Sequence, residues 1–340
     1  MPSYVLGIDV GTGGTRALIV DDSGRIVTSA TEEHEPFASP KIGWAEQRPE
    51  DWWRATGAAV RTVLAGGNLR GDQISCVGFS GQMHGAVMLD AAGEGLRYVE
   101  VRYSPLLHRP ALTLAQAIEA PLAGIKRGEA ETGMKVGLIV CGIRTRAPAE
   151  SLELARAAAD YRAAGVVAFD LAGAERGFPA RDHAAAFAYA AQHGMACTCH
   201  AGEGDGPHSI HEALHQCGAQ RIGHGTRLGE DPALLEYVIE RKIPLEMCLT
   251  SNLHTHTVAS LAEHPFKRYL DAGVIVTLNT DGRVVDGISL TDEYFVAQSA
   301  LGLTKTDLAR VVLNACESAF LPEFEKVALV SRVQSELEAL

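Results

Sequence analysis

The chain of 340 residues has few aromatic side chains, no long apolar run and fewer basic than acidic residues. It has 30 Lys and Arg against 42 Asp and Glu, so its net charge is −12 and it lacks the positive surplus needed to neutralise a phosphate backbone. No apolar run could cross a bilayer, and the N-terminal segment MPSYVLGIDVGTGG lacks the basic start of a signal peptide. We therefore expect a cytoplasmic protein that binds neither nucleic acid nor membrane.

The seven cysteines do not have the pattern of a disulfide framework, because their number is odd and they are scattered along the chain. Cys197 and Cys199 alternate along an apparent strand directly before His200. A thiol ligand to a metal is one interpretation of this pair. Burial in the core is the commoner setting for strand cysteines, and we favour it.

The first part of the sequence has the pattern of a small α/β unit. Residues 4–30 alternate and turn like a β-hairpin, with Gly residues and Asp-Ser-Gly at the bends. Residues 48–65 have apolar side chains at helical spacing after an acidic first turn, and residues 73–81 have the pattern of a buried strand.

From about residue 98 onward, short apolar runs alternate with alanine-rich helical stretches, which is the pattern of repeated βα units around a parallel sheet. The expected strands are residues 98–104, 136–143, 165–171, 195–200, 221–224, 244–249 and 273–279. A closed (β/α)₈ barrel has eight strands, whereas this part of the chain supplies seven. The sequence therefore predicts an incomplete TIM-type barrel.

Side chains that can bind a metal stand where three of these expected strands end. His200 ends one strand, His224 ends the next, and Asp281 follows the last. In a parallel barrel the carboxyl ends of the strands share one face, so these side chains should meet. Glu203 follows His200 by three residues and could act as a general acid beside the metal. A histidine at a strand end is usually only hydrogen-bonded in place, but the combination favours a metal site.

The motifs of this larger part resemble those of adenosine deaminases. They are YVEVRYSP (98–105), FDLAG (169–173), HAGE (200–203), GHGT (223–226), CLTSN (248–252), LNTD (278–281) and ESAFLPEFEK (317–326), in family order. The resemblance implies a zinc-dependent barrel that hydrolyses the 6-amino group of a purine nucleoside, adenosine, to give inosine and ammonia.

The resemblance also implies roles for individual residues. His200 and Asp281 match metal ligands, and Glu203 matches the acid that protonates the purine ring. His224 matches the residue that orients and deprotonates the attacking water. Gly173 matches a backbone contact to the base. Glu203, His224 and Asp281 are therefore the expected catalytic residues.

Two departures from the family pattern imply a weak or inactive enzyme. The family begins with a barrel strand that ends in His-x-His, and both histidines are zinc ligands. This strand has no counterpart here, and two protein ligands are fewer than the three that catalytic zinc sites use. Gly282 stands where the family has a side chain that binds the purine ring.

Residues 1–96 resemble instead the start of a xylulokinase or a related sugar kinase of the FGGY family. The resemblance rests on GIDVGTGGTRALIVD (7–21), GWAEQRPEDWW (43–53) and GFSGQMHGAVMLD (78–90). It implies a partial actin-like, ribonuclease H-like kinase lobe. The phosphate-binding residues would be Asp9, Gly11, Thr12, Gly13 and Thr15, and the sugar-binding residues Met83 and His84.

A complete ATP-dependent sugar kinase is an alternative function, but it requires a later catalytic aspartate and a second ATP-binding lobe, which the sequence lacks. We therefore expect little use of ATP and Mg²⁺. A third alternative is an inactive scaffold that keeps a purine pocket. The two resemblances meet near Leu96 and Arg97, inside a structural unit of each family, so we infer domains 1–96 and 97–340 of a chimera that was engineered, computed or produced by an error in gene assembly.

Five further features of the sequence bear on self-association, metal binding and charge pairing. The open barrel has unpaired strand edges, which favour self-association. His84 could supply a metal ligand, although its spacing from the barrel is poor. His254 and His256 are expected in a polar loop, and His208, His211 and His215 on a solvated helix face. Glu100 and Arg102 lie on the same face of a strand and could form a buried ion pair.

Overall fold

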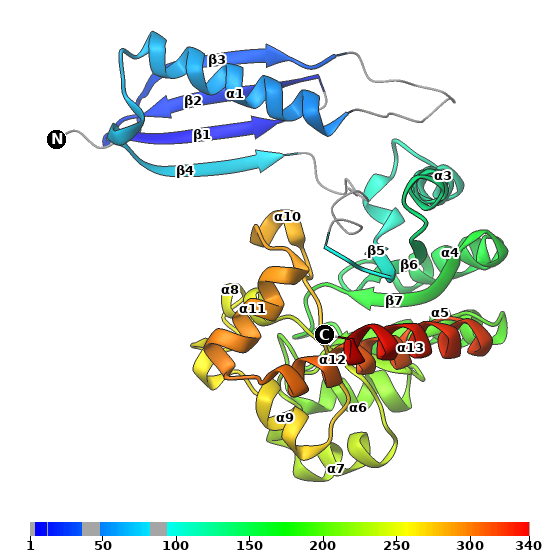
Figure 1. Cartoon of the computed structure of the whole chain (residues 1–340). Coiled ribbons are helices and arrows are strands. Elements are labelled where there is room, and N and C mark those ends of the chain that lie inside the picture. The colour runs from blue at the N-terminus through cyan, green and yellow to red at the C-terminus, as the bar shows by residue number, and fades with distance from the viewer. Residues whose placement is uncertain (1–3, 12, 36–47, 82–93, 340) are drawn as a thin grey trace. The chain divides into compact units, whose positions relative to one another are not determined.

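The computed structural model describes residues 4–11, 13–35, 48–81 and 94–339 (Figure 1). The chain divides into two compact units, residues 1–86 and 87–340. The domain boundary predicted near Leu96 and Arg97 stays a prediction.

The smaller unit is a four-stranded sheet with one helix on it. Its elements are β1 (Tyr4–Val10), β2 (Gly14–Val20), β3 (Ile26–Glu33), α1 (Pro49–Gly66) and β4 (Ile74–Gly81). The strand order is β3-β2-β1-β4, with β1 antiparallel to β2 and parallel to β4. Figure 1 shows α1 lying along the sheet, where Ala59 and Val63 pack with Leu6, Ile8 and Ile19. The hairpin, the helix and the strand predicted for this region are all present.

The larger unit is built around a curled sheet of seven parallel strands, as the sequence predicted. The strands are β5 (Tyr98–Tyr103), β6 (Lys135–Ile143), β7 (Val166–Ala172), β8 (Ala196–Ala201), β9 (Arg221–His224), β10 (Leu245–Met247) and β11 (Val276–Leu278). Their order in the sheet follows the sequence from β5 to β11. Within the described ranges no strand pairs with the outer edge of β5 or β11, so this is an incomplete TIM-type barrel. The self-association that such edges favour stays a prediction.

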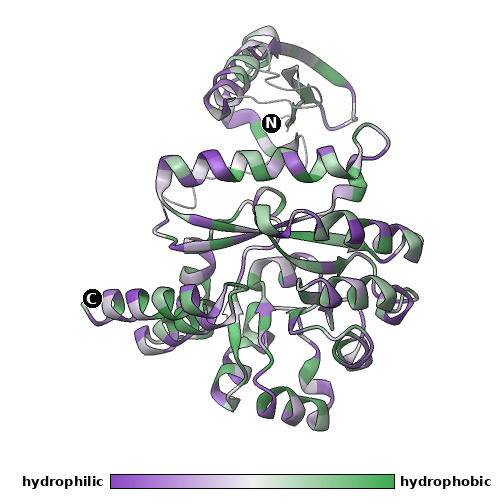
Figure 2. Cartoon of the chain, turned by 90° about the vertical axis from the view of Figure 1, so that its right-hand side faces the viewer, coloured by the Kyte–Doolittle hydropathy of each residue, from purple (hydrophilic) through white to green (hydrophobic). Residues whose placement is uncertain are grey.

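Helices follow the strands, and most of them pack against the sheet. They are α3 (Leu114–Thr132), α4 (Pro148–Ala159), α5 (Ala184–Gln192), α6 (Pro207–His215), α7 (Pro232–Glu240), α8 (Leu249–His254), α9 (Phe266–Ala272), α10 (Arg283–Asp286), α11 (Leu290–Leu301), α12 (Lys305–Ser318) and α13 (Glu323–Glu338). Helices α4 and α5 pack against β6–β8 and bury the outer face of these strands (Figure 1), and Figure 2 colours the chain by hydropathy. None of the described helices has the length and apolar character that a membrane span requires.

The interior of the sheet contains a network of buried charges, defined here as Glu100, Arg102, Asp170, Arg221 and Glu246. Arg221 lies 2.6 Å from carboxylate oxygens of both Glu100 and Glu246. Arg102 pairs with Glu246 and lies 3.5 Å from Asp170. The predicted ion pair between Glu100 and Arg102 is therefore wrong, because each finds a partner on another strand that faces it across the curled sheet. The network links β5, β7, β9 and β10.

The C-terminal segment contacts both edge strands of the open sheet. Asn314 of α12 donates a hydrogen bond of 3.0 Å to the backbone carbonyl of Val276 in β11. The Phe320 backbone N–H donates to Glu100 in β5 at 2.6 Å, and Arg97, just before β5, pairs with Glu336 of α13 at 2.9 Å. These contacts join the C-terminal segment to the two strands at the open edges of the sheet.

The remaining histidines and cysteines are mostly placed as expected. His208, His211 and His215 are exposed on α6, and Cys197 and Cys199 are buried in β8. The loop predicted around His254 is wrong in part, because this residue ends α8 and its ring lies 2.7 Å from Asp286.

We expect Glu246→Gln to destabilise the larger unit by about 3–5 kcal/mol, because it leaves two buried guanidinium groups short of a carboxylate. The matched control is Glu153→Gln, which breaks the more exposed pair with Arg109 and should cost at most about 1 kcal/mol. Chemical denaturation followed by circular dichroism measures both losses of stability. Tryptophan fluorescence would not report on the larger unit, because the three tryptophans all lie in residues 1–86. Equal losses in the two variants would contradict the expectation.

The parent chain and Glu246→Gln should also differ in how much stability they lose in acid. Burial raises the pKa of Glu246, but Arg102 and Arg221 outweigh burial and lower it from 4.5 to about 2. A lowered pKa means that the stabilisation is complete above about pH 4.5 and is lost as the pH falls through about 2. Glu246→Gln should therefore lose less stability than the parent chain between these two pH values.

Candidate functional site

Three side chains that can bind a metal meet at the carboxyl ends of the strands. His200 comes from the end of β8, His224 ends β9, and Asp281 follows β11. One ligand atom of each lies within 4.8 Å of those of the others. His224 and Asp281 both have positive φ, 61° and 51°, a conformation that is uncommon outside glycine and is often found at functional sites.

His200 is held by a buried carboxylate. Its Nδ1 lies 2.9 Å from Asp170 Oδ2, which leaves Nε2 as the ring nitrogen available to a metal. Burial lowers the pKa of His200, but the negative charge of Asp170 outweighs burial, and the pKa is raised overall. The pKa of Asp170 is correspondingly depressed, because His200 and Arg102 together outweigh its burial.

His224 is buried, and burial lowers its pKa. Its Nδ1 lies 3.0 Å from the amide nitrogen of Asn252. Its Nε2 lies 3.5 Å from Glu203 Oε2 and 4.0 Å from Asp281 Oδ2. The imidazole therefore stands between the predicted acid and the predicted metal ligand.

Glu203 is positioned by its own side-chain contacts and by its backbone. Its Oε1 accepts hydrogen bonds from Thr255 at 3.0 Å and Asn252 at 3.3 Å. The buried carboxylate of Glu175 accepts the backbone N–H groups of Gly202, Glu203 and Gly204, at 2.9, 2.9 and 3.0 Å. Three hydrogen bonds to one carboxylate fix the loop that carries Glu203.

Asp281 accepts a hydrogen bond of 2.8 Å from the Ser251 hydroxyl. Burial raises the pKa of Asp281, but His224 and His200 outweigh burial and lower it. The side chain is therefore ionised near neutral pH, which is the form that a metal requires.

The two glycines of interest differ in their backbone conformation. Gly173 has φ of +100°, so a side chain would be strained there, whereas an added Cβ would be 3.5 Å from Ile143, an ordinary contact. Gly282 has φ of −81° and precedes α10. The conformation of the chain thus favours glycine at position 173 but does not require it at 282.

In the smaller unit, the hairpin residues predicted to bind phosphate are only partly available. Asp9 and Gly13 are exposed, and the N–H of Gly11 donates to the carbonyl of Gly14 at 3.0 Å. Thr15 is buried, and its hydroxyl lies 2.8 Å from Nε2 of His34. Thr12, Met83 and His84 lie outside the described residues.

Comparison with known proteins finds two families in the chain. The adenosine deaminase model matches residues 83–336. The model of the N-terminal domain of FGGY carbohydrate kinases matches residues 4–103. The adenosine deaminase of Klebsiella pneumoniae strain 342 is 43% identical over 248 residues, which cover 72% of this chain and 74% of the relative.

This chain belongs to the adenosine deaminase family.

Other similar proteins are also named as deaminases. The adenosine deaminase of Salmonella newport is 42% identical over 72% of this chain and 74% of its own length. Among solved structures, an adenine deaminase from Arthrobacter aurescens matches with a TM-score of 0.70 and 26% identity, over 74% of this chain and 77% of that one. An Arabidopsis N6-mAMP deaminase matches with a TM-score of 0.66 and 26% identity, over 73% and 76%. Members of the deaminase family and structures of related purine deaminases thus support a purine deaminase function.

The structure adds four residues to this deaminase-family site that sequence reasoning did not single out: Asp170, Glu175, Ser251 and Asn252. Three of them lie in the motifs FDLAG and CLTSN. The sequence therefore indicated the motifs, but it did not indicate the roles of these residues. Glu175 lies outside any quoted motif, and its role follows only from the fold.

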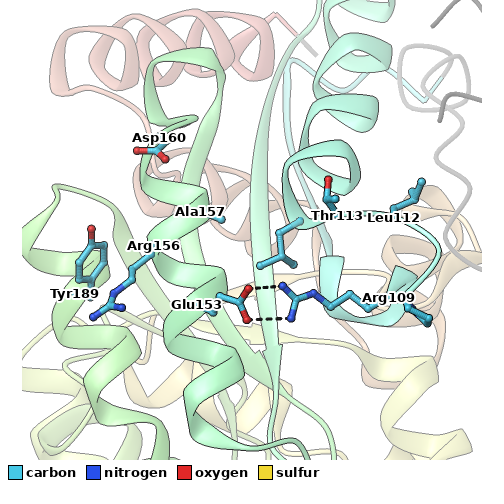
Figure 3. A pocket seen from close by; sticks show the side chains of 10 residues that line it. Arg109, Leu112, Thr113, Glu153, Arg156, Ala157, Asp160 and Tyr189 are labelled. Atoms are coloured by element: carbon cyan, nitrogen blue, oxygen red, sulfur yellow. Dashed lines mark hydrogen bonds and ion pairs between the residues drawn. The ribbon is translucent and has the colours of Figure 1, made fainter. Parts of the chain in front are cut away.

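A pocket of about 740 Å³ lies on the outer side of the larger unit, away from these residues. Arg109, Thr113 and Leu114 line one side of it, and residues of α4 and α5 line the other. Figure 3 shows Arg109 reaching across to Glu153, while Arg156 lies 5.6 Å from the ring centre of Tyr189. None of the predicted site residues that the structure describes lines this pocket.

We expect Glu175→Gln to loosen the loop that carries Glu203, because an amide oxygen replaces the carboxylate that accepts three N–H groups. Hydrogen bonds to a charged group contribute about 1.5–3 kcal/mol, so amide exchange at residues 202–204 should accelerate about tenfold or more. Hydrogen exchange followed by NMR measures it. Glu150→Gln, which breaks the ion pair between Glu150 in the first turn of α4 and Arg146 just before that helix, is the control and should leave these three amides unchanged. Unchanged protection in Glu175→Gln would show that Glu175 does not hold the loop.

Proposed function

We propose that this chain is a zinc-dependent hydrolase of the adenosine deaminase type, converting adenosine and water to inosine and ammonia. The observation that carries the proposal is the convergence of His200, His224 and Asp281 within 4.8 Å, with Glu203 beside them. Its substrate would be a small purine nucleoside.

The donor set at this site fits zinc. Imidazole nitrogen and carboxylate oxygen are common zinc ligands, at about 2.0–2.2 Å from the ion. We assign His200 and Asp281 as the ligands, because Nε2 of His200 is left available and Asp281 is ionised. When bound, zinc lowers the pKa of a water molecule and supplies a hydroxide nucleophile near neutral pH.

The chain's own residues would then orient and protonate the substrate. Glu203, held by Thr255, Asn252 and the loop that Glu175 fixes, would protonate the purine ring. His224 would orient the attacking water from its place between Glu203 and Asp281. Gly173 would offer its backbone to the base.

We infer that turnover is well below that of complete family members. The structure describes no strand that pairs beyond β5 or β11 in residues 94–339, which is the place of the family strand with His-x-His. Gly282 has no side chain to bind the purine ring. Zinc affinity and substrate affinity should both fall as a result.

The first test is the zinc content of the purified protein after zinc loading and removal of free metal. We expect the parent chain to hold up to about one zinc more than His200→Ala, since a catalytic site binds one ion through His200. A His211→Ala and His215→Ala double variant controls for zinc on α6, where these rings lie 4.3 Å apart. Equal zinc in the parent chain and in His200→Ala would contradict the proposed site.

The second test is inosine formation by the zinc-loaded protein. Removing a general acid costs about 10²–10⁴-fold in rate, so Glu203→Gln should lose at least a hundredfold of the parent activity while keeping its zinc. Activity that is unchanged in Glu203→Gln would contradict the assignment. Adenosine that raises the melting temperature without forming inosine would show a purine-binding scaffold in place of an enzyme.

A further inference from the structure

Asn252 lies buried between two histidines, and both the oxygen and the nitrogen of its side-chain amide have hydrogen-bond partners. Its Oδ1 lies 2.9 Å from the Thr226 hydroxyl and 3.2 Å from Nε2 of His264. Its Nδ2 lies 3.0 Å from Nδ1 of His224 and 3.3 Å from Oε1 of Glu203. Asn252 is fully buried, so no water competes for these positions.

The direction of these hydrogen bonds begins at a backbone group that can only donate. The N–H of Phe266 points at Nδ1 of His264, at 3.2 Å. Nδ1 of His264 must therefore accept, and a neutral His264 carries its proton on Nε2. That Nε2–H donates to Oδ1 of Asn252, which places the NH₂ group of the amide toward His224.

The reverse orientation of the Asn252 amide conflicts with two neighbours. Its Oδ1 would then face Oε1 of Glu203, acceptor against acceptor, and its NH₂ group would face the Nε2–H of His264, donor against donor. The orientation is thus fixed from both ends. Burial lowers the pKa of His264 to about 4, which agrees with a neutral ring at pH 7.

We propose that Phe266 N–H, His264 and Asn252 form a relay that sets the tautomer of His224, with its Nδ1 accepting and its proton on Nε2. The catalytic role of this tautomer rests on the proposed function, whereas the hydrogen bonds that set the tautomer do not. Nε2 of His224 is the atom that faces Glu203 and Asp281, at 3.5 and 4.0 Å.

The relay makes Asn252 and His264 positioning residues and redefines what His224 can do. An imidazole that presents N–H to the site can donate a hydrogen bond to a water molecule there, but in this tautomer it offers no lone pair to a metal or to a proton. His224 is then an orienting donor. In this tautomer His224 cannot take up the proton of the attacking water, which is the role that the family resemblance assigns to it.

The relay is tested on metal-free protein without substrate, by long-range ¹H–¹⁵N NMR of chain labelled with ¹⁵N-histidine. The spectrum distinguishes a protonated ring nitrogen from an unprotonated one. The chain has 13 histidines, so His224→Gln and His264→Gln assign the two ring systems by the loss of their signals. We expect both His224 and His264 to carry their proton on Nε2.

Asn252→Asp should reverse the state of His224, because a carboxylate can only accept and Nδ1 of His224 would become protonated. Asn314→Asp is the control: it also replaces a side-chain amide donor with a carboxylate, here at the part-buried position that bonds the Val276 carbonyl, and should leave the His224 tautomer unchanged. Circular dichroism checks that both variants fold.

A His224 proton on Nδ1 in the parent chain overturns the relay, whether or not either variant folds. An unprotonated Nδ1 in folded Asn252→Asp also overturns it. Since no metal, substrate or turnover enters the measurement, failure of the deaminase proposal and failure of the relay are distinguishable.

Discussion

The candidate site depends on the buried carboxylate of Asp170 inside the open barrel. Two side chains, Arg102 and His200, both lie against this carboxylate. Arg102 approaches it from β5, and His200 lies against it at 2.9 Å from β8. The same Arg102 pairs with Glu246, which also binds Arg221. Buried charges are stable only when each has a partner, so the strands that carry them must keep their mutual positions. The network that holds the curled sheet thereby also orients a predicted metal ligand.

The architecture of the larger unit could be predicted from sequence because its signals are local. Apolar runs such as residues 136–143 and 166–172 are buried on both faces, and each is followed by a helix. The convergence of His200, His224 and Asp281 could also be predicted, since parallel strands bring their carboxyl ends to one face. Thr113 with Gln116 and Ser289 with Asp292 mark the starts of α3 and α11 in the same local way.

The sequence could not predict the contacts between side chains that the fold brings together from distant positions. Glu175 binds a loop 27–29 residues away, and Arg221 binds Glu100 across 121 residues. The pairing of Glu100 with Arg102 was wrong for this reason, since neighbours on one strand say nothing about the strands opposite. The direction of the hydrogen bonds through Asn252 likewise needs the position of a backbone N–H fourteen residues later, Phe266.

We propose that seven strands suffice to hold His200 and Asp281 in position to bind a metal, although the edge of the sheet is open. An anomalous difference map at the zinc absorption edge, from crystals of zinc-loaded protein, tests this arrangement. We expect a peak at about 2.0–2.2 Å from Nε2 of His200 and a carboxylate oxygen of Asp281. A peak found only elsewhere, such as between His211 and His215, or no peak at all, would contradict it.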